Sequence, residues 1–185
     1  MNRQSEEYSA AFLEIRESGV RLLGDLRDDQ LNWKPAPDRW SVGECVDHLT
    51  ITGELLLPGM EAAIASGRAR GLTSDGPFAY GWPGRMFIES MQPGGRLKVK
   101  TLRLYTPAAT HERLGLSARF ARLQDGFLSA LRASDGLDLA RIRVASPANR
   151  LLRFCLGVWY EVTIAHERRH LAQAAAVRMG EGFPG

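Results

Sequence analysis

The stretch AHERRHL at residues 165–171 decides how the fold is interpreted, because it places two histidines inside an apolar helical pattern. His166 and His170 lie four residues apart, so on a helix both imidazoles project from the same side. That side continues through Trp159 before the pair and through Val177 after it. The two histidines therefore interrupt a stripe that faces a core, and they do not lie on a solvent-exposed face.

Four segments of the chain carry apolar residues at three- and four-residue steps, which is the period of an amphipathic helix. Their expected ranges are about 5–26, about 41–66, about 110–133, and from after Pro147 to about 179. Ser41 and Glu44 have the spacing of a capping box, which predicts the start of the second helix, and Pro58 either kinks that helix or lies near its end. With no convincing strand pattern, the sequence predicts an all-α four-helix bundle in a single domain over residues 1–185.

A long irregular connection is expected between the second and third helices, over residues 67–109. It contains seven glycines and four prolines, a composition that breaks regular structure. It also contains several large apolar residues, so part of it has to pack against the bundle. Two interpretations stay open: a flap that covers one end of the bundle, or the lid of a pocket. The tract 97–105 alternates in part, which favours an extended conformation.

Composition limits the class of protein. The chain has 185 residues, 44% hydrophobic and 24% charged, as in an ordinary globular domain. The two cysteines, Cys45 and Cys155, exclude a disulfide-dense secreted scaffold. No apolar run approaches the roughly 20 residues of a membrane span, and residues 1–7 are charged, unlike a signal peptide. We therefore expect a soluble, cytoplasmic protein that has no membrane partner.

The charge pattern does not favour a nucleic-acid partner. The formal net charge is only +3, from 24 basic and 21 acidic residues that are spread along the chain. The densest basic stretch, residues 96–103, has no accompanying nucleic-acid-binding motif. We therefore expect these charges to solvate a surface.

A third histidine, His48, lies on the second predicted helix beside an otherwise apolar stripe. Buried polar groups cost free energy unless they have partners, so three imidazoles directed into one interior require an explanation. A divalent metal would satisfy all three nitrogens, whereas the alternative is that each histidine hydrogen-bonds to a neighbour. Three ligands would leave coordination positions open for water or substrate, as in catalytic sites. Imidazole suits zinc, nickel, iron and copper alike. His111, at the start of the third predicted helix, is expected to be a surface residue.

The sequence from His166 to His170 also matches H-E-x-x-H, the zinc-protease motif in which the glutamate polarises a metal-bound water. The surrounding sequence does not support a protease. Gln173 and Ala176 occupy the positions at which the metzincin motif has glycine and a third histidine, and no protease-like sheet is predicted.

The arrangement of these motifs resembles the DinB/YfiT-like metalloproteins over nearly the whole chain. The motifs are WSVGECVDHL at residues 40–49, a proline-bearing loop that ends near YTP at 105–107, and AHERRHLAQ at 165–173. The resemblance implies a four-helix bundle with one histidine on the second helix and an H-x-x-x-H pair on the fourth, which bind a divalent metal together. By position, the implied ligands are His48, His166 and His170.

The resemblance also implies a choice of activities. Characterised relatives include thiol transferases that use bacillithiol, mycothiol or glutathione, a thiol-dependent maleylpyruvate isomerase, and domains related to ergothioneine synthesis. The implied function is a metal-dependent S-transferase that acts on a small-molecule substrate with a low-molecular-weight thiol as cosubstrate. The alternatives are a metal-dependent hydrolase, in which the metal activates a bound water, and a non-catalytic metal- or ligand-binding stress protein. A homodimer is compatible with the sequence.

Several residues near the predicted ligands are secondary candidates. Glu167 is the candidate catalytic residue, which would orient a bound water or act as a base; otherwise it is a solvated helix residue. Cys45 is either a fourth ligand or a small core residue, and Gln173 either bonds to a ligand or ties helices together, the second being favoured. Cys155 is roughly 16 Å along the helix from His166, too far to coordinate the same ion. The aromatic residues expected either to line the pocket or to form core are Trp40, Trp82, Trp159 and Tyr160.

Overall fold

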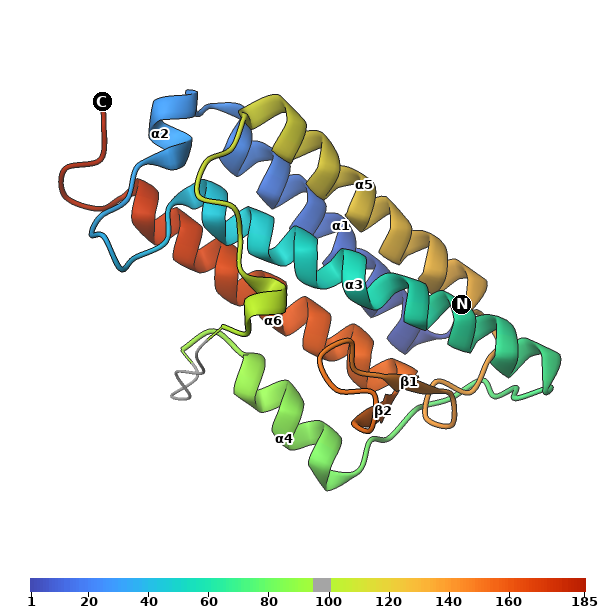
Figure 1. Ribbon diagram of the computed structural model, residues 1–185. Helices are drawn as coiled ribbons and strands as arrows, with labels where there is room; N and C mark the ends of the chain where they lie inside the picture. The colour runs from blue at the N-terminus through green and yellow to red at the C-terminus, as the bar shows by residue number, and fades with distance from the viewer. Residues whose placement is uncertain (95–100) are drawn as a thin grey trace.

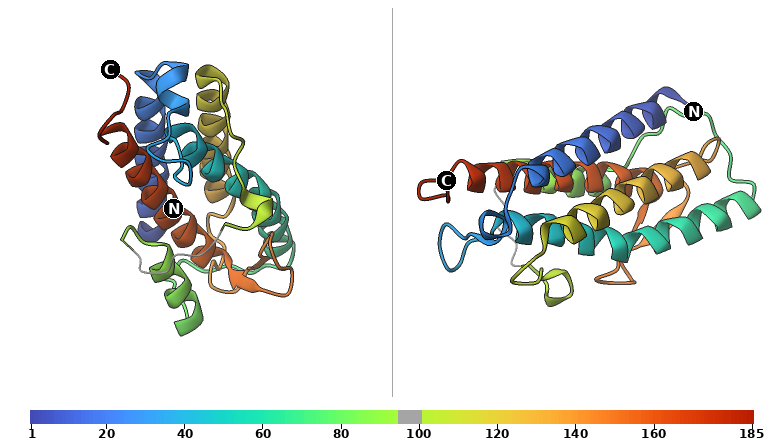
Figure 2. Two further views of the ribbon diagram at one scale, coloured as in Figure 1. Left: turned by 60° about the vertical axis from the view of Figure 1, so that its left-hand side comes forward. Right: turned by 90° about the horizontal axis from the view of Figure 1, so that it is seen from above.

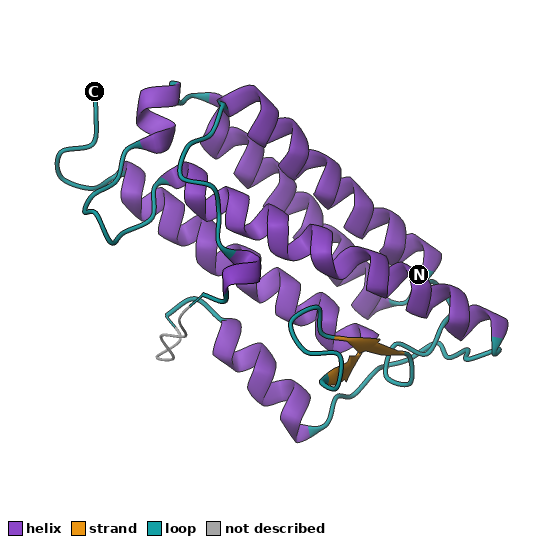
Figure 3. Cartoon of the chain, in the orientation of Figure 1, coloured by secondary structure: helices purple, strands orange, loops and turns teal. Residues whose placement is uncertain are grey.

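The computed structural model describes residues 1–94 and 101–185 of the chain. The chain is mainly helical with one small two-stranded sheet (Figure 3), which confirms the prediction of a mainly helical fold. The elements, in chain order, are α1 (Arg3–Gly24), α2 (Asp28–Asn32), α3 (Val42–Ala69), α4 (Trp82–Met91), the 3-10 helix η1 (Arg103–Tyr105), α5 (Arg113–Ala133), β1 (Arg143–Ala145), β2 (Arg153–Cys155) and α6 (Leu156–Arg178). Each helix in the described ranges is too short or too polar to cross a bilayer.

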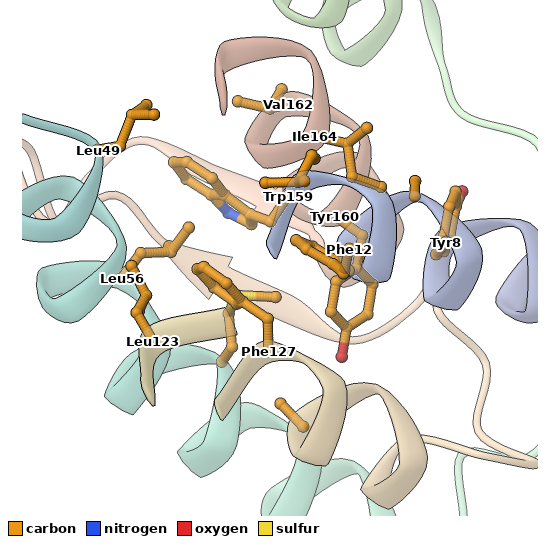
Figure 4. Close-up of a cluster of buried hydrophobic side chains, with 14 of the residues drawn as sticks. Tyr8, Phe12, Leu49, Leu56, Leu123, Phe127, Trp159, Tyr160, Val162 and Ile164 are labelled. Atoms are coloured by element: carbon orange, nitrogen blue, oxygen red, sulfur yellow. The ribbon is translucent and has the colours of Figure 1, made fainter. Parts of the chain in front are cut away.

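The four long helices, α1, α3, α5 and α6, lie side by side in an elongated molecule (Figures 1 and 2). Helix α1 packs against α5, α5 against α3, α3 against α6, and α6 against α1, so the contacts close into a ring around a core. The core contains packed aromatic rings (Figure 4): Phe12 stacks on Phe127 with 5.1 Å between ring centroids and meets Tyr160 edge-on at 6.2 Å. These contacts hold α6 against α1 and α5, and so fix the position of the helix that carries the histidine pair.

The first turns of α3 are buried on every side. Ser41 caps the helix as the capping-box spacing predicts: its hydroxyl accepts from the Glu44 amide at 3.1 Å, and the Glu44 carboxylate accepts from the Ser41 amide at 2.8 Å. Every residue from 41 to 50 is buried, because α2, η1, α5 and α6 all pack against this helix. Pro58 lies inside the helix, which continues to Ala69, beyond the expected end near residue 66.

The connection over residues 67–109 is less irregular than expected. It contains helix α4, in which Pro83 occupies the first turn, where a missing amide hydrogen removes no helical bond. Residues 103–105 form η1, so this part of the tract 97–105 is not extended as predicted. Residues 97–100 of that tract, and 96–100 of the basic stretch, lie outside the described residues.

The last long helix begins later than predicted. Instead of starting after Pro147, α6 begins at Leu156, and the preceding residues form an antiparallel hairpin in which Val144 pairs with Phe154. Leu152, which falls inside the predicted helix range, lies in this hairpin with 44% of its surface exposed. The hairpin is anchored to the helix because the Trp159 indole N–H donates to the Val144 carbonyl at 3.1 Å.

We predict that Gly157→Ala destabilises the fold, because the Tyr80 hydroxyl occupies the space that a side chain at position 157 would need. Tyr80 docks residues 73–91 onto the long helices and its hydroxyl lies 3.0 Å from that of Tyr8. Overpacking of this kind costs about 1–3 kcal/mol, measurable as a lower free energy of unfolding in urea. Gly24→Ala is the control, because nothing lies within 4 Å of that position. Equal effects of the two substitutions would contradict the prediction.

Candidate metal centre

Three histidines from two helices converge at one point between α3 and α6. His48 comes from the buried first half of α3, and His166 and His170 come from successive turns of α6. One ring nitrogen of each lies within 4.8 Å of the others, and the Nε2 atoms of His48 and His166 are 3.3 Å apart. The structure thus brings together the three residues that the sequence pattern predicted, and this group could hold a metal ion.

Hydrogen bonds outside the cluster turn two of the imidazoles towards its centre. The Nδ1–H of His48 donates to the Tyr105 carbonyl at 2.7 Å, and the Nδ1–H of His170 donates to Gln173 Oε1 at 3.0 Å. Because both acceptors are oxygens that carry no hydrogen, each ring is protonated at Nδ1 and keeps its Nε2 lone pair for a ligand. Gln173 therefore bonds to a ligand candidate. The interpretation favoured from the sequence, that Gln173 simply ties helices together, is wrong.

Burial keeps the three imidazoles uncharged at neutral pH. Desolvation lowers the pKa of His48, and desolvation together with the neighbouring His170 and His48 lowers that of His166 well below its usual value. The pKa of His170 falls to about 4 from desolvation and the proximity of His48. Three neutral imidazoles that point at one centre are a donor set that suits zinc, nickel, iron or copper. The residues present therefore fit a divalent metal.

The Tyr105 carbonyl is held in place by a buried charged network next to His48. Asp47, with its side chain 3% exposed, accepts from the Ala108 amide at 2.9 Å and from Arg119 at 2.7 Å. Because Ala108 follows Tyr105 by three residues, this contact ties the segment that orients the His48 ring to the helix that carries it. Trp40 packs on the same ring, with 4.8 Å between the ring centroids.

The prediction that His111 lies at the surface is wrong. Its side chain is only 7% exposed and contacts the same network, with Nε2 bonded to the Ala108 carbonyl at 2.9 Å. The space exists because residue 43 is glycine: a Cβ there would lie 2.8 Å from His111 Cδ2. His111 is thus a packing residue beside Asp47 and lies outside the group of three histidines.

Glu167, the predicted catalytic residue, is buried beside the cluster and lines a cavity that the three histidines also line. It is 1% exposed, and its Oε1 accepts from Gln124 Nε2 at 2.7 Å. Within the described residues, Glu167 Oε2 and Gln124 Oε1 are the buried side-chain oxygens that have no hydrogen-bond partner. Burial raises the pKa of this carboxyl to about 8, so it is largely protonated at neutral pH. The interpretation as a solvated helix residue is wrong, and the catalytic role stays a prediction.

The other secondary candidates lie outside the metal-ligand group. Cys45 is fully buried, and burial raises the pKa of its thiol to about 12, so it is a core residue as the second interpretation held. Trp159 lines the cavity that adjoins the histidines, whereas Tyr160 packs in the aromatic core. Trp82 is 66% exposed on α4 and lies away from the cavity.

A cavity of about 350 Å³ adjoins the three histidines. Its walls are the facing sides of α3 and α6, and its other lining residues come from α4, from residues 101–105 and from residues 146–148. Helix α4 and residues 101–105 belong to the 67–109 connection, so this connection lines the pocket. Residues 146–148 belong to the turn of the hairpin. The sequence pointed to the connection through its length and aromatic content, but no signal in the sequence pointed to the hairpin turn.

Comparison with known proteins gives one match. A family model described as the DinB superfamily matches residues 11–174, which includes the three histidines, Glu167 and nearly all of the four long helices. No curated protein matches the chain, and no solved structure does. The family assignment therefore rests on the family model.

We predict that Glu167 makes the metal-free protein less stable as the pH rises. Its carboxyl has a pKa near 8 when folded, against about 4.5 for the free side chain. Between those values the folded state keeps a proton that the unfolded state releases, so the free energy of unfolding falls by up to about 1.4 kcal/mol per pH unit. The three histidines oppose this slope in the lower part of the range, because their ordinary pKa near 6.5 lets the unfolded state bind protons that the folded state does not. Urea denaturation with a chelator between about pH 6.5 and 8 should therefore show the Glu167 slope as the difference between wild type and a variant without this carboxyl.

Glu167→Gln should remove the slope, because an amide cannot titrate and can bond to both polar atoms of Gln124. Glu181→Gln, at an exposed position, serves as the matched control and should keep it. The histidine contribution is common to both proteins, so a free-energy difference between wild type and Glu167→Gln that stays constant over this pH range would refute this assignment.

Proposed function

The chain belongs to the DinB superfamily, and we propose that it is a divalent-metal-dependent S-transferase, which joins an electrophilic small molecule to the sulfur of a low-molecular-weight thiol. In this proposal α1, α3, α5 and α6 form the four-helix bundle that the sequence resemblance implies. His48, His166 and His170 hold the ion, with zinc, nickel or iron as the candidate metals.

The observation that carries the proposal is the convergence of three uncharged imidazoles beside a cavity between α3 and α6. Three protein ligands leave coordination positions free, and the cavity provides space beside them. When bound, a divalent ion supplies one kind of chemistry at this site: it lowers the pKa of a coordinated thiol so that the thiolate is present at neutral pH.

The cysteines of the chain support an external thiol as the nucleophile. Cys45 is buried with a thiol pKa of about 12, and burial also raises the pKa of Cys155. Both therefore stay protonated at neutral pH, and a protonated thiol is a poor nucleophile. Neither belongs to the group of residues at the centre. In the proposed reaction the nucleophilic sulfur is accordingly supplied by a cosubstrate.

The remaining residues handle protons and exclude water. In the transfer, the thiol loses its proton and its sulfur forms a bond to the electrophilic carbon. If the electrophile carries a leaving group, that group departs with its electron pair. If the sulfur instead opens a ring or adds across a double bond, the product takes up a proton. Glu167 has a pKa near 8 and is the group beside the histidines that can accept or release that proton. Phe87 and Met91 of α4 give the cavity an apolar side, which reduces the contact of a bound substrate with water.

A hydrolase is the second candidate, and the position of Glu167 favours it. This carboxyl follows the ligand candidate His166 directly and lines the cavity, where its ionised form, which predominates above a pKa of about 8, could take a proton from an attacking water. The two functions differ in their products, because hydrolysis consumes water and leaves the thiol unchanged.

We predict that the purified protein binds about one equivalent of zinc, nickel or iron per chain, and that His166→Ala loses it. Removal of a ligand should weaken metal binding more than about 100-fold, since loss of the groups that merely orient ligands already costs about 10–100-fold. Elemental analysis and titration with zinc test this. The control is His111→Gln, at the histidine outside the cluster, with thermal melting as a check on folding. Equal metal content in wild type and His166→Ala would remove His166 from the site.

We also predict that the metal-loaded protein consumes thiol in the presence of an electrophile. Incubation with glutathione, bacillithiol or mycothiol and a panel of electrophiles should give a thioether adduct detectable by mass spectrometry. Chelation of the metal, or His48→Ala, should abolish adduct formation. Product formation that depends on the metal but leaves the thiol unchanged would favour the hydrolase, and an inactive protein that binds metal would favour a non-catalytic role.

A further inference from the structure

The cavity extends away from the three histidines along two antiparallel helices. On α3 its wall runs from His48 through Thr52 to Leu56, and on α6 it runs from His170 back to Trp159. At 1.5 Å per residue, the wall on α3 spans about 12 Å. The cavity is therefore a groove with a near end at the histidines and a far end at Leu56 and Trp159.

The far end offers a ligand carbon atoms and few free polar groups. The Trp159 indole N–H is already bonded to the Val144 carbonyl at 3.1 Å. The Thr52 hydroxyl donates to the helical carbonyls of His48 and Leu49, both at 2.9 Å. Leu56, Phe87 and Val162 complete this end. A polar group placed there would lose its water without gaining a partner, so the far end selects an apolar body.

The near end carries positive charge. Arg169 is the permanently charged side chain among the lining residues that the structure describes, and it lies on the same helix as His166 and His170. Its Nη1 donates to the Ser90 carbonyl at the end of α4, at 3.2 Å, which holds the guanidinium at this end of the groove. The cationic side chain next to the histidines favours an anionic group on the ligand.

We propose that the groove binds an elongated apolar acid, with an aliphatic or aromatic body at the far end and an anionic group beside Arg169 and the three histidines. This inference rests on the proposed function, in which such a molecule is the electrophilic substrate. It names the chemical class of that substrate: an apolar chain or ring system of about 12 Å that ends in a carboxylate or a similar anion.

The test is a calorimetric series on the zinc-loaded protein with butanoate, hexanoate, octanoate and decanoate, all below their micelle concentrations. Affinity should rise about fourfold for each added methylene until the chain fills the groove, because each newly buried methylene leaves water. Octanol, which has the same chain without the charge, should bind at least about tenfold more weakly than octanoate, because a charged partner is missing. Affinities that do not depend on chain length, or equal binding of octanol and octanoate, would overturn the proposal.

Two pairs of variants assign the ends of the groove. Arg169→Gln should weaken octanoate binding and leave octanol unchanged, while its neighbour Arg168→Gln, which pairs with Glu14 on the exposed side of α6, should alter neither. Phe87→Gln should flatten the chain-length series, while Met86→Gln, at a position 48% exposed on α4, should not. If both members of a pair behave alike while thermal melting shows folded proteins, that end of the groove is assigned wrongly.

The same series separates this inference from the proposed function. A protein that binds zinc but shows no dependence on chain length retains its proposed function and loses this substrate class. A protein that binds no zinc loses the proposed function, and the chain-length series on the metal-free protein still tests the groove, because Leu56, Phe87 and Arg169 are present in either form.

Discussion

The antiparallel contact between the first half of α3 and the second half of α6 is the constraint on which the rest of the structure depends. It encloses polar side chains, the buried His48 and Asp47 and the half-buried His166 and His170, in surroundings where each needs a partner. The surrounding segments supply those partners: Tyr105 for the His48 ring, and Ala108 and Arg119 for Asp47. The path of residues 105–108 is therefore set by the polar groups of α3 as well as by apolar packing.

Local patterns predicted the long helices and the histidine cluster, because the information lies within one or two turns. The four-residue spacing of His166 and His170 places both rings on one side of a helix whatever the remainder of the fold, and the capping box at Ser41 marks a helix start by local bonding alone. His48 lies one turn from apolar residues on α3, so its direction into the interior also follows from periodicity.

The features that the sequence did not predict depend on contacts between distant residues. The hairpin exists because Val144 pairs with Phe154 and its carbonyl accepts from Trp159, neither of which a helical period reveals. His111 is enclosed because residue 43, far away in the sequence, has no side chain. The same holds for Glu167: it is buried against α5, where its Oε1 accepts from Gln124, and desolvation at that position raises its pKa. No spacing within α6 indicates this environment.

The enclosure of both cysteines has a consequence for a protein that handles electrophiles. Such a protein is exposed to covalent damage by the molecules it processes, and free thiolates are the groups that they modify most readily. Cys45 is fully enclosed and Cys155 is 6% exposed, and burial raises the pKa of each thiol. Under the proposed S-transferase function, the fold shields its own sulfur atoms from alkylation, and the sulfur of the small-molecule cosubstrate is the accessible target.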